Sequence, residues 1–351
     1  MKIVKDSIRL LQNARYDHYF YRELNHYTKG EKKIVLPTHY QKEILDYYRQ
    51  FGFRVSLDWH NYIYKITGLQ DVRIIPDNLY HVVMEPHFMN KQMSSWEDKA
   101  YMYLHLPKAT FPECYLRRVN NYFINNDNDI ISAQEAFNII KQYDDVIIKP
   151  SLASGSGRGV QKVKVNSIDT DVLAGFGKNF IVQKPIVQSQ QYSRFNNSSV
   201  NTEKIISFLF DGNVYILTSM LRVGAPGAIT DSASSGLGYT IGINDDGLLN
   251  DVGYSLFGDS RTTDAYGIPF KGMCLEAHKE ILHQIRQFHK LLPYFMVVSW
   301  DYAVDSMGKP VLIEYNLGYP ETLIYQINNG PLFGGLTDQV LSYISKEEKN
   351  K

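Results

Sequence analysis

A glycine-rich stretch between two strand-like segments most limits the folds open to this chain. Residues Ser154 to Gly159 follow the apolar run Val146 to Pro150 and precede Val160 to Val165, which alternates with the period of a strand. Glycines at alternate positions let backbone N–H groups approach an anion closely. A Walker A loop would end in Gly-Lys-Ser/Thr, and both it and a Rossmann loop open a helix, so neither fits. The pattern predicts a strand–loop–strand flap over a triphosphate, with Lys149 before it; a flexible surface hairpin is the alternative.

A hairpin near the C-terminus carries the second chemical signal. Val297 to Asp305 and Lys309 to Asn316 have the pattern of two strands around a short turn. Folding this hairpin brings Asp301 opposite residues near Glu314, with the Asn316 amide one pleat further along. A carboxylate that ends so apolar a strand needs a partner, and hard oxygen ligands of this kind suit Mg²⁺. A surface hairpin whose acids face water is the alternative.

A third segment combines an arginine with a turn rich in small residues. Arg222 ends an apolar strand pattern at Leu221 to Gly224, and Asp231 to Gly236 follows it. A guanidinium fork beside such a turn suits a phosphate. By itself this arrangement is more typical of a surface ion pair.

Composition excludes several classes of protein. The 351 residues carry 37 Lys+Arg and 37 Asp+Glu, so the chain lacks the cationic field that non-specific nucleic-acid binding needs. No apolar run approaches the roughly 18 residues that span a bilayer, and residues 1–23 lack the apolar core of a signal peptide. The two cysteines fit neither a disulfide framework nor a Cys-rich metal site. We therefore expect a cytoplasmic protein with no membrane span and no nucleic-acid partner.

Helix signals and further hairpins complete the outline. Thr38 with Gln41, and Ser132 with Glu135, match the capping-box pattern at helix starts. Residues 71–85 are expected to be irregular and extended around their prolines. The other predicted elements are helices over 133–143 and 275–292, a strand over 180–185, and a hairpin joining Ile205–Phe210 to Val214–Leu221 through Asp211-Gly212.

The changes in pattern divide the chain into four parts. Residues 1–95 are expected to be mostly helical, and 96–185 to mix strands and helices around the glycine-rich loop. Residues 186–345 begin with strands and continue with helices, and 346–351 form a charged tail. The fold class predicted is therefore α+β.

The three blocks, in this order, resemble the ATP-grasp superfamily, and more narrowly the sugar-transfer-associated ATP-grasp family found with polysaccharide biosynthesis genes. The resemblance covers about residues 70–320. It rests on Asp98-Lys99, Ile148-Lys149-Pro150, Gly155 to Val160, Phe180 to Gln188, Val200-Asn201-Thr202, Leu221 to Gly224, Asp231 to Gly236 and the Asp301–Glu314–Asn316 hairpin. It implies two α+β lobes that sandwich a nucleotide, preceded by the helical N-terminal region.

The resemblance also implies which residues bind ATP. Lys99 and Lys149 would neutralise α- and β-phosphate charge. Gln183 to Ile186 would form the hinge that reads adenine, through the Gln183 side chain and backbone groups of Lys184 and Ile186. The ribose would lie near Gln188 or Gln190. The lid over the phosphates would be formed by Ser154, Gly155, Ser156, Gly157 and Gly159.

The same resemblance implies the reacting side of the site. Arg222 would stabilise the γ-phosphoryl group in transit, and Asp231 and Ser234 lie near the expected acceptor side. The metal ligands, for one or two Mg²⁺ ions, would be Asp301, Glu314 and Asn316.

Two positions depart from the family pattern. Lys204 stands where the family has Arg, so an anion contact there keeps its charge but loses bidentate geometry. Gln183 replaces the hinge acid common in the superfamily, although its amide oxygen can still accept from adenine.

The activity implied is a ligation in two steps. A substrate carboxylate takes the γ-phosphoryl group to form an acyl phosphate, which an amine then attacks. The substrates would be a small carboxylate and an amine, for example a sugar or an amino acid, in surface polysaccharide or capsule synthesis. Two alternatives stay open: an ATP-grasp phosphotransferase, and a non-catalytic nucleotide-binding partner of a glycosyltransferase.

Overall fold

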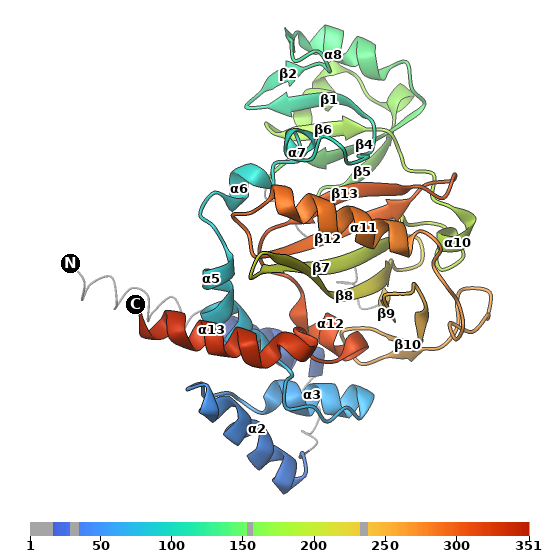
Figure 1. Ribbon diagram of the computed structural model, residues 1–351. Coiled ribbons are helices and arrows are strands. Elements are labelled where there is room, and N and C mark those ends of the chain that lie inside the picture. The colour runs from blue at the N-terminus through green and yellow to red at the C-terminus, as the bar shows by residue number, and fades with distance from the viewer. Residues whose placement is uncertain (1–16, 29–34, 153–156, 232–237, 351) are drawn as a thin grey trace.

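Two antiparallel sheets organise the chain (Figure 1). The computed structural model describes residues 17–28, 35–152, 157–231 and 238–350. A six-stranded sheet has the order β3-β2-β1-β6-β4-β5, and a seven-stranded sheet has the order β11-β10-β9-β8-β7-β12-β13. In Figure 1 the smaller sheet lies at the top, the larger one in the middle and the N-terminal helices at the bottom. This arrangement is the mixed α+β class that the sequence predicts.

The six-stranded sheet contains the strands on both sides of the glycine-rich loop. Helices α8 (Ala133–Ile140) and α9 (Thr170–Gly175) pack on it around one apolar core. The Ser132–Glu135 capping box is confirmed, because the Ser132 hydroxyl accepts from the Glu135 N–H and the Glu135 carboxylate accepts from the Ser132 N–H. The strands are β1 (Cys114–Val119), β2 (Tyr122–Ile124), β3 (Ile130–Ile131), β4 (Asp145–Pro150), β5 (Gln161–Lys164) and β6 (Phe180–Gln183).

The seven-stranded sheet contains the two predicted hairpins, β7–β8 and β12–β13. The first is tight because Asp211 and Gly212 both have positive φ, 46° and 74°, as a two-residue hairpin turn requires. Helix α11 (His278–Phe288), continued by η3 (His289–Leu291), covers one face of the sheet. The strands are β7 (Thr202–Phe210), β8 (Asn213–Val223), β9 (Tyr239–Ile243), β10 (Leu249–Tyr254), β11 (Ser260–Arg261), β12 (Val297–Val304) and β13 (Pro310–Asn316).

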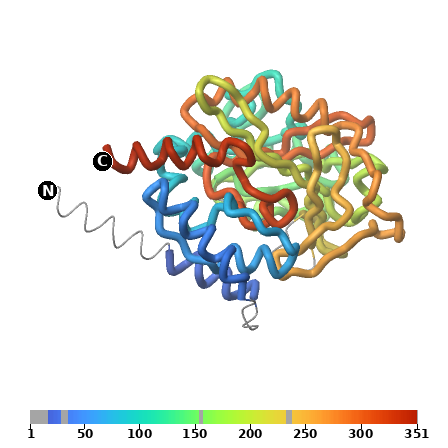
Figure 2. Tube along the Cα trace, turned by 60° about the horizontal axis from the view of Figure 1, so that its bottom comes forward, coloured from blue at the N-terminus to red at the C-terminus, as the bar shows by residue number. Residues whose placement is uncertain are grey.

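The N-terminal helices cover part of the opposite face of this sheet together with the C-terminal ones. Ile206 and Phe208 of β7 share a buried core with residues of both sets of helices. Figure 2 shows α13 beside the blue N-terminal helices, and the His87–Glu348 ion pair of 2.6 Å joins them. The helices are α2 (Thr38–Gln50), α3 (Asp58–Thr67), α4 (Asp77–Leu79), η1 (Tyr80–Met84), α5 (Glu85–Phe88), α12 (Thr322–Asn329) and α13 (Thr337–Lys349).

Short helical turns complete the chain. They are α6 (Met93–Trp96), α7 (Met102–His105), η2 (Val165–Ser167), α10 (Gln190–Ser193) and η4 (Gly334–Leu336). Residues 17–28 are also helical. No helix among the described residues is both long and apolar enough to cross a membrane.

Three local predictions are wrong. The Thr38–Gln41 capping box does not form: Thr38 is already helical, and the Gln41 amide donates to the Leu36 carbonyl at 2.7 Å. Of residues 71–85, 71–76 are irregular as expected, but 77–85 are helical: Pro76 precedes the first turn, and a π-helical turn ends at Met84, two residues before Pro86. Residues 346–349, expected in a separate tail, are the last turn of α13.

Candidate functional site

The site is a cavity of about 730 Å³ lined by residues of both sheets. This volume lies within the range of small-molecule sites. Of the predicted residues, those that line it are Lys99, Lys149, Gly157, Gln183, Lys184, Ile186, Gln188, Lys204, Arg222, Asp231, Asp301, Glu314 and Asn316. Gly159 and the exposed Gln190 are not among its lining residues. Ser154, Gly155, Ser156 and Ser234 lie outside the described residues.

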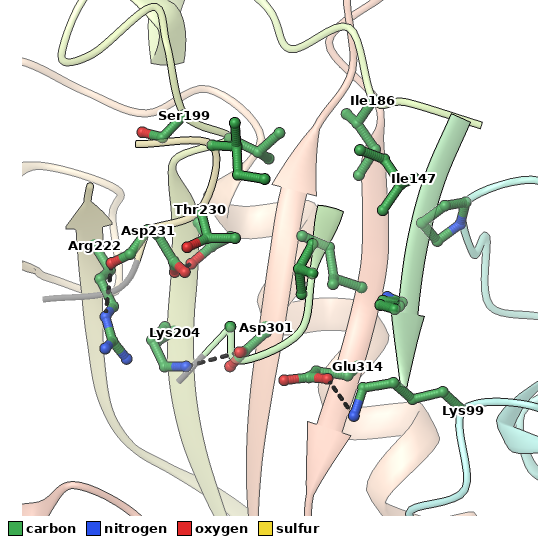
Figure 3. A pocket seen from close by; sticks show the side chains of 18 of the residues that line it. Lys99, Ile147, Ile186, Ser199, Lys204, Arg222, Thr230, Asp231, Asp301 and Glu314 are labelled. Carbon is green, nitrogen blue, oxygen red and sulfur yellow. Dashed lines mark hydrogen bonds and ion pairs between the residues drawn. The ribbon is translucent and has the colours of Figure 1, made fainter. Parts of the chain in front are cut away.

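Two carboxylates face each other across the predicted hairpin. Asp301 on β12 is paired directly with Glu314 on β13, and with Lys204 on the other neighbouring strand, β7. The Lys204 ammonium lies 2.7 Å from Asp301, and the Lys99 ammonium lies 2.9 Å from Glu314 (Figure 3). The strand register therefore places the two acids side by side along the cavity, and each acid has a lysine ammonium against it.

These charges change one another's ionisation. Burial raises the pKa of Asp301 to about 6; the Lys204 ammonium opposes this rise and the Glu314 carboxylate adds to it. Burial also works against the Glu314 charge, but Lys99 and Lys149 outweigh it and hold the pKa of Glu314 below its ordinary value. The pKa values of the two facing acids are therefore shifted in opposite directions.

The acids fit the divalent cation that the resemblance implies. One oxygen of Asp301, Oδ1, is buried without a hydrogen-bond partner, which leaves a hard oxygen for an incoming ion. Glu314 and Asn316 supply further oxygens on the next strand and line the same cavity. Among the described residues no group of three or more His, Cys, Asp or Glu could hold a metal, so this candidate depends on two carboxylates and an amide.

Lys149 has the character expected of a phosphate-binding lysine. Lys149 lies on β4, lines the cavity and is 6% exposed. Burial lowers the pKa of Lys149 to about 8, although the Glu314 carboxylate opposes the change. A cation held in such a place at a cost to the fold is typical of a ligand site.

Arg222 lies at the other end of the cavity. Its Nη1 is 2.8 Å from the Glu321 carboxylate, and its Nε donates to the Asp231 carbonyl at 3.0 Å. The Asp231 carboxylate accepts from the Thr202 hydroxyl. Burial disfavours the Arg222 charge, but Glu321 and Asp231 keep its pKa above the ordinary range.

The described part of the glycine loop closely approaches its own strand β4 and the connection between β8 and β9. Gly157 has φ +69°, and a Cβ there would lie 2.9 Å from the Thr230 hydroxyl. Gly159 has φ +75°, and a Cβ would lie 2.8 Å from Pro150 Cγ. Glycine is therefore required at both positions by conformation and by space.

The hinge and ribose positions make hydrogen bonds of their own. The Gln183 amide donates to the Pro112 carbonyl at 3.3 Å, and the Lys184 N–H donates to Glu113 at 2.9 Å. A contact from Lys184 to adenine would therefore use its carbonyl oxygen. The Gln188 amide donates to the Ser199 carbonyl at 2.6 Å and accepts from the Asn201 N–H at 3.0 Å, which ties down the loop between them.

Sequence reasoning missed several residues that line the cavity. Glu97, Tyr319 and Glu321 all belong to it. Two of them lie shortly after β13, in Gly318-Tyr319-Pro320-Glu321. An aromatic residue and an acid in a turn after such a strand are the one local signal that could have indicated them.

Solved structures with similar folds are distant in sequence. The ATP-grasp ligase PsnB with precursor peptide PsnA2 and AMPPNP has 11% identity and a TM-score of 0.43, with 74% of this chain and 62% of that one covered. The L-amino acid ligase from Bacillus licheniformis has 13% identity and a TM-score of 0.40, with 71% of this chain and 48% of that one covered. D-alanyl-alanine synthetase A from Vibrio cholerae has 12% identity and a TM-score of 0.45, with 74% of this chain and 68% of that one covered. The chain thus spans less than two thirds of the first two proteins.

The family comparison covers more than half of the chain. No curated protein matches it in sequence. A family model described as sugar-transfer associated ATP-grasp matches residues 88–341, which include both sheets and every predicted site residue. The chain belongs to the sugar-transfer associated ATP-grasp family.

Proposed function

We propose that this protein is an ATP- and Mg²⁺-dependent ligase that joins a carboxylate to an amine through an acyl phosphate. The observation that carries the proposal is that several cations and a facing pair of acids line one cavity. Lys149, Lys204 and Arg222 line it together with the facing pair Asp301 and Glu314. Cations for phosphate oxygens and acids for a divalent ion are both needed to hold a nucleoside triphosphate.

Residues of both sheets would bind different parts of the nucleotide. Adenine would lie at Gln183 to Ile186, and Lys99 and Lys149 would neutralise the inner phosphates. Asp301, Glu314 and Asn316 would hold one or two Mg²⁺ ions, which when bound withdraw electron density from the phosphate oxygens. Arg222 would stabilise the charge of the γ-phosphoryl group during transfer.

In the first step a substrate carboxylate oxygen bonds to the γ-phosphorus, and the bond from phosphorus to the bridging oxygen of ADP breaks. In the second step an amine nitrogen bonds to the acyl carbon, the tetrahedral intermediate expels phosphate, and the nitrogen loses a proton. Arg222 and Lys204 would hold the reacting oxygens, with Asp231 on the acceptor side. The closed cavity would keep water from the acyl phosphate.

The biological setting follows from the family description. We propose a role in surface polysaccharide or capsule synthesis in the cytoplasm, with a sugar or an amino acid among the substrates. The description of the matching family as sugar-transfer associated supports this setting.

The test is release of ADP from Mg-ATP with panels of amines and carboxylates, with and without hydroxylamine. A ligase forms an acyl hydroxamate, because hydroxylamine captures the acyl phosphate. ADP release without hydroxamate, together with a phosphorylated acceptor, would favour the phosphotransferase. Absence of ADP release with every acceptor would favour the non-catalytic nucleotide-binding protein.

Two variants test the site itself. Lys149→Ala and Glu314→Ala are expected to abolish turnover while the folded state is retained. Normal turnover by Glu314→Ala would contradict the metal assignment.

A further inference from the structure

The loop that follows the metal-binding strand is held by residues from the start of the chain. It joins β13 to α12, and Gly318, Tyr319, Pro320 and Glu321 all line the cavity. Its first residue, Leu317, donates its N–H to the Glu97 carboxylate at 2.6 Å. A cavity wall of the family-matched region therefore depends on contacts outside the two sheets.

A buried glutamate that is hydrogen-bonded to a histidine fixes the next part of the loop. The Tyr319 N–H donates to Oε1 of Glu85, a residue that is 2% exposed. The other oxygen of Glu85 is 2.7 Å from His81 Nδ1. A buried carboxylate is costly unless its oxygens are satisfied, and here one oxygen is satisfied by the backbone of Tyr319.

Tyr319 adopts an unusual backbone conformation at this point. Its φ is +55°, in the left-handed region that bulky residues rarely occupy. Strain of this kind persists where surrounding contacts hold it, and it gathers at ligand sites. Asparagine or glycine would fit this φ more easily, so the tyrosine side chain itself needs an explanation.

A column of rings supports one face of the Tyr319 ring. Its centroid is 6.1 Å from that of His81 at an interplanar angle of 17°, and Phe20 stacks on His81 at 4.4 Å and 6°. Tyr319 is nevertheless 54% exposed and lines the cavity. Residues of the N-terminal region thus support an aromatic ring that lines the cavity.

The neighbouring glycine shows how closely the loop is packed. A Cβ at Gly318 would lie 2.9 Å from Met89 Cε and 3.0 Å from Met93 Cε. Glu321, two residues beyond Tyr319, pairs with Arg222. Tyr319 therefore belongs to the same cavity-lining loop as the partner of Arg222.

We propose that Tyr319 is the platform on which a pyranose ring of the acceptor stacks. This inference rests on the proposed ligase function and specifies its acceptor. The C–H bonds on one face of a pyranose pack on an aromatic ring, while its hydroxyl groups can reach polar residues of the cavity. His81, Glu85 and Phe20 are positioning residues, because they hold the platform without facing the acceptor.

The experiment measures acceptor binding separately from nucleotide binding. Saturation-transfer NMR is recorded with a panel of neutral and acidic methyl pyranosides, using full-length protein with Mg²⁺ and a non-hydrolysable ATP analogue. Gluconate, an open-chain sugar acid, is the control without a ring. Calorimetry gives the affinity for the nucleotide analogue in each variant.

Three variants separate the ring from the backbone. Tyr319→Phe keeps the platform and is expected to bind the pyranosides like the wild type. Tyr319→Asn suits the positive φ but removes the ring, and should weaken pyranoside binding about tenfold with nucleotide affinity unchanged. Tyr319→Leu, a second variant without an aromatic ring, should show the same loss.

The outcomes are distinct. Equal pyranoside binding by Tyr319→Asn and wild type, absence of pyranoside binding by the wild type, or equal binding of gluconate would overturn the platform. So would a parallel loss of nucleotide affinity in Tyr319→Asn, which would assign the ring to the nucleotide. Failure of the wild type to bind the nucleotide would instead contradict the proposed ligase.

Discussion

Glu203 and Lys204 are neighbours on β7, yet they belong to two different electrostatic environments. Glu203 accepts from the Tyr192 hydroxyl, and its other oxygen is 2.5 Å from His278 Nδ1. The side chains of Glu203 and His278 are both 0% exposed. We refer to Tyr192, Glu203 and His278 as the buried triad.

Lys204 points instead into the cavity. It pairs with Asp301, whose second oxygen has no hydrogen-bond partner. The Arg222–Glu321 pair nearby leaves the Glu321 side chain 39% exposed. Here the ion pairs are open to a ligand.

The difference separates structural charges from functional ones. In the buried triad both carboxylate oxygens are engaged and none of the three residues lines the cavity, so the network serves the fold, although His278 Nε2 has no hydrogen-bond partner among the described residues. In the cavity, acids and cations neutralise one another while each can exchange its partner for a ligand. The same charge chemistry on two faces of one strand therefore has two uses.

The largest effect should come from removing a cavity cation. Lys149→Gln is expected to lower kcat/KM about 100- to 1,000-fold, because the charge faces phosphate oxygens. The melting temperature should stay at or above that of the wild type, since burial disfavours the Lys149 charge. Coupled ADP-release kinetics and calorimetry measure both. A large loss of stability would show that Lys149, like the buried triad, mainly stabilises the fold.

The next effect concerns the buried triad. Glu203→Leu is expected to lower the free energy of unfolding by about 3 kcal/mol, because it leaves buried groups of Tyr192 and His278 without their partner. Urea unfolding measures it. Lys204→Gln is the matched control on the opposite face and should cost less stability, because its partner Asp301 borders the cavity. Equal losses of unfolding free energy in the two variants would contradict the proposed difference between the two faces of β7.

A pH effect should come from the same covered face as the triad. His289 contacts Ser207 at 2.7 Å, and burial lowers the pKa of His289 to about 4. In the unfolded chain the His289 side chain has its ordinary pKa of 6.5. The contribution of neutral His289 to the free energy of unfolding is therefore complete above pH 6.5 and is lost as the pH falls toward 4. The loss is about 2 kcal/mol by about pH 5. His289→Gln should unfold with a weaker pH dependence between these limits; an unchanged dependence would contradict the assignment.

The smallest effect should come from a surface ion pair. Lys279 and Asp246 are 2.9 Å apart with side chains 69% and 73% exposed. Lys279→Ala is expected to change the free energy of unfolding by less than about 0.5 kcal/mol. Urea unfolding at low and high salt checks this. A loss as large as that of Glu203→Leu would show that burial is not what distinguishes these pairs.

Short-range patterns predict much of the fold and part of the site. The Ser132–Glu135 cap, the Asp211-Gly212 turn and the strands around the glycine loop form as expected, because each depends on residues a few positions apart. The nearness of Asp301 to Glu314 is also predictable, since a short turn sets the register of a hairpin. Their direct pairing is not, because it depends on a register shift between Asp301 and Tyr302. The Thr38–Gln41 capping box does not form, because the Gln41 amide donates to the Leu36 carbonyl instead.

Contacts between distant segments decide the rest. Glu321 meets Arg222 across 99 residues, and Glu85 holds Tyr319 across 234. No periodicity or local motif encodes such pairs, because they arise only when the N-terminal helices and the sheets pack together.

The sequence by itself determined the α+β class, the two hairpins and the charged residues able to hold a triphosphate. Only the tertiary structure decided which charges are sealed in the core, which border the cavity, and which ring the N-terminal region presents to it. The physical reason is that hairpin register depends on nearby residues, whereas burial depends on the whole packed chain.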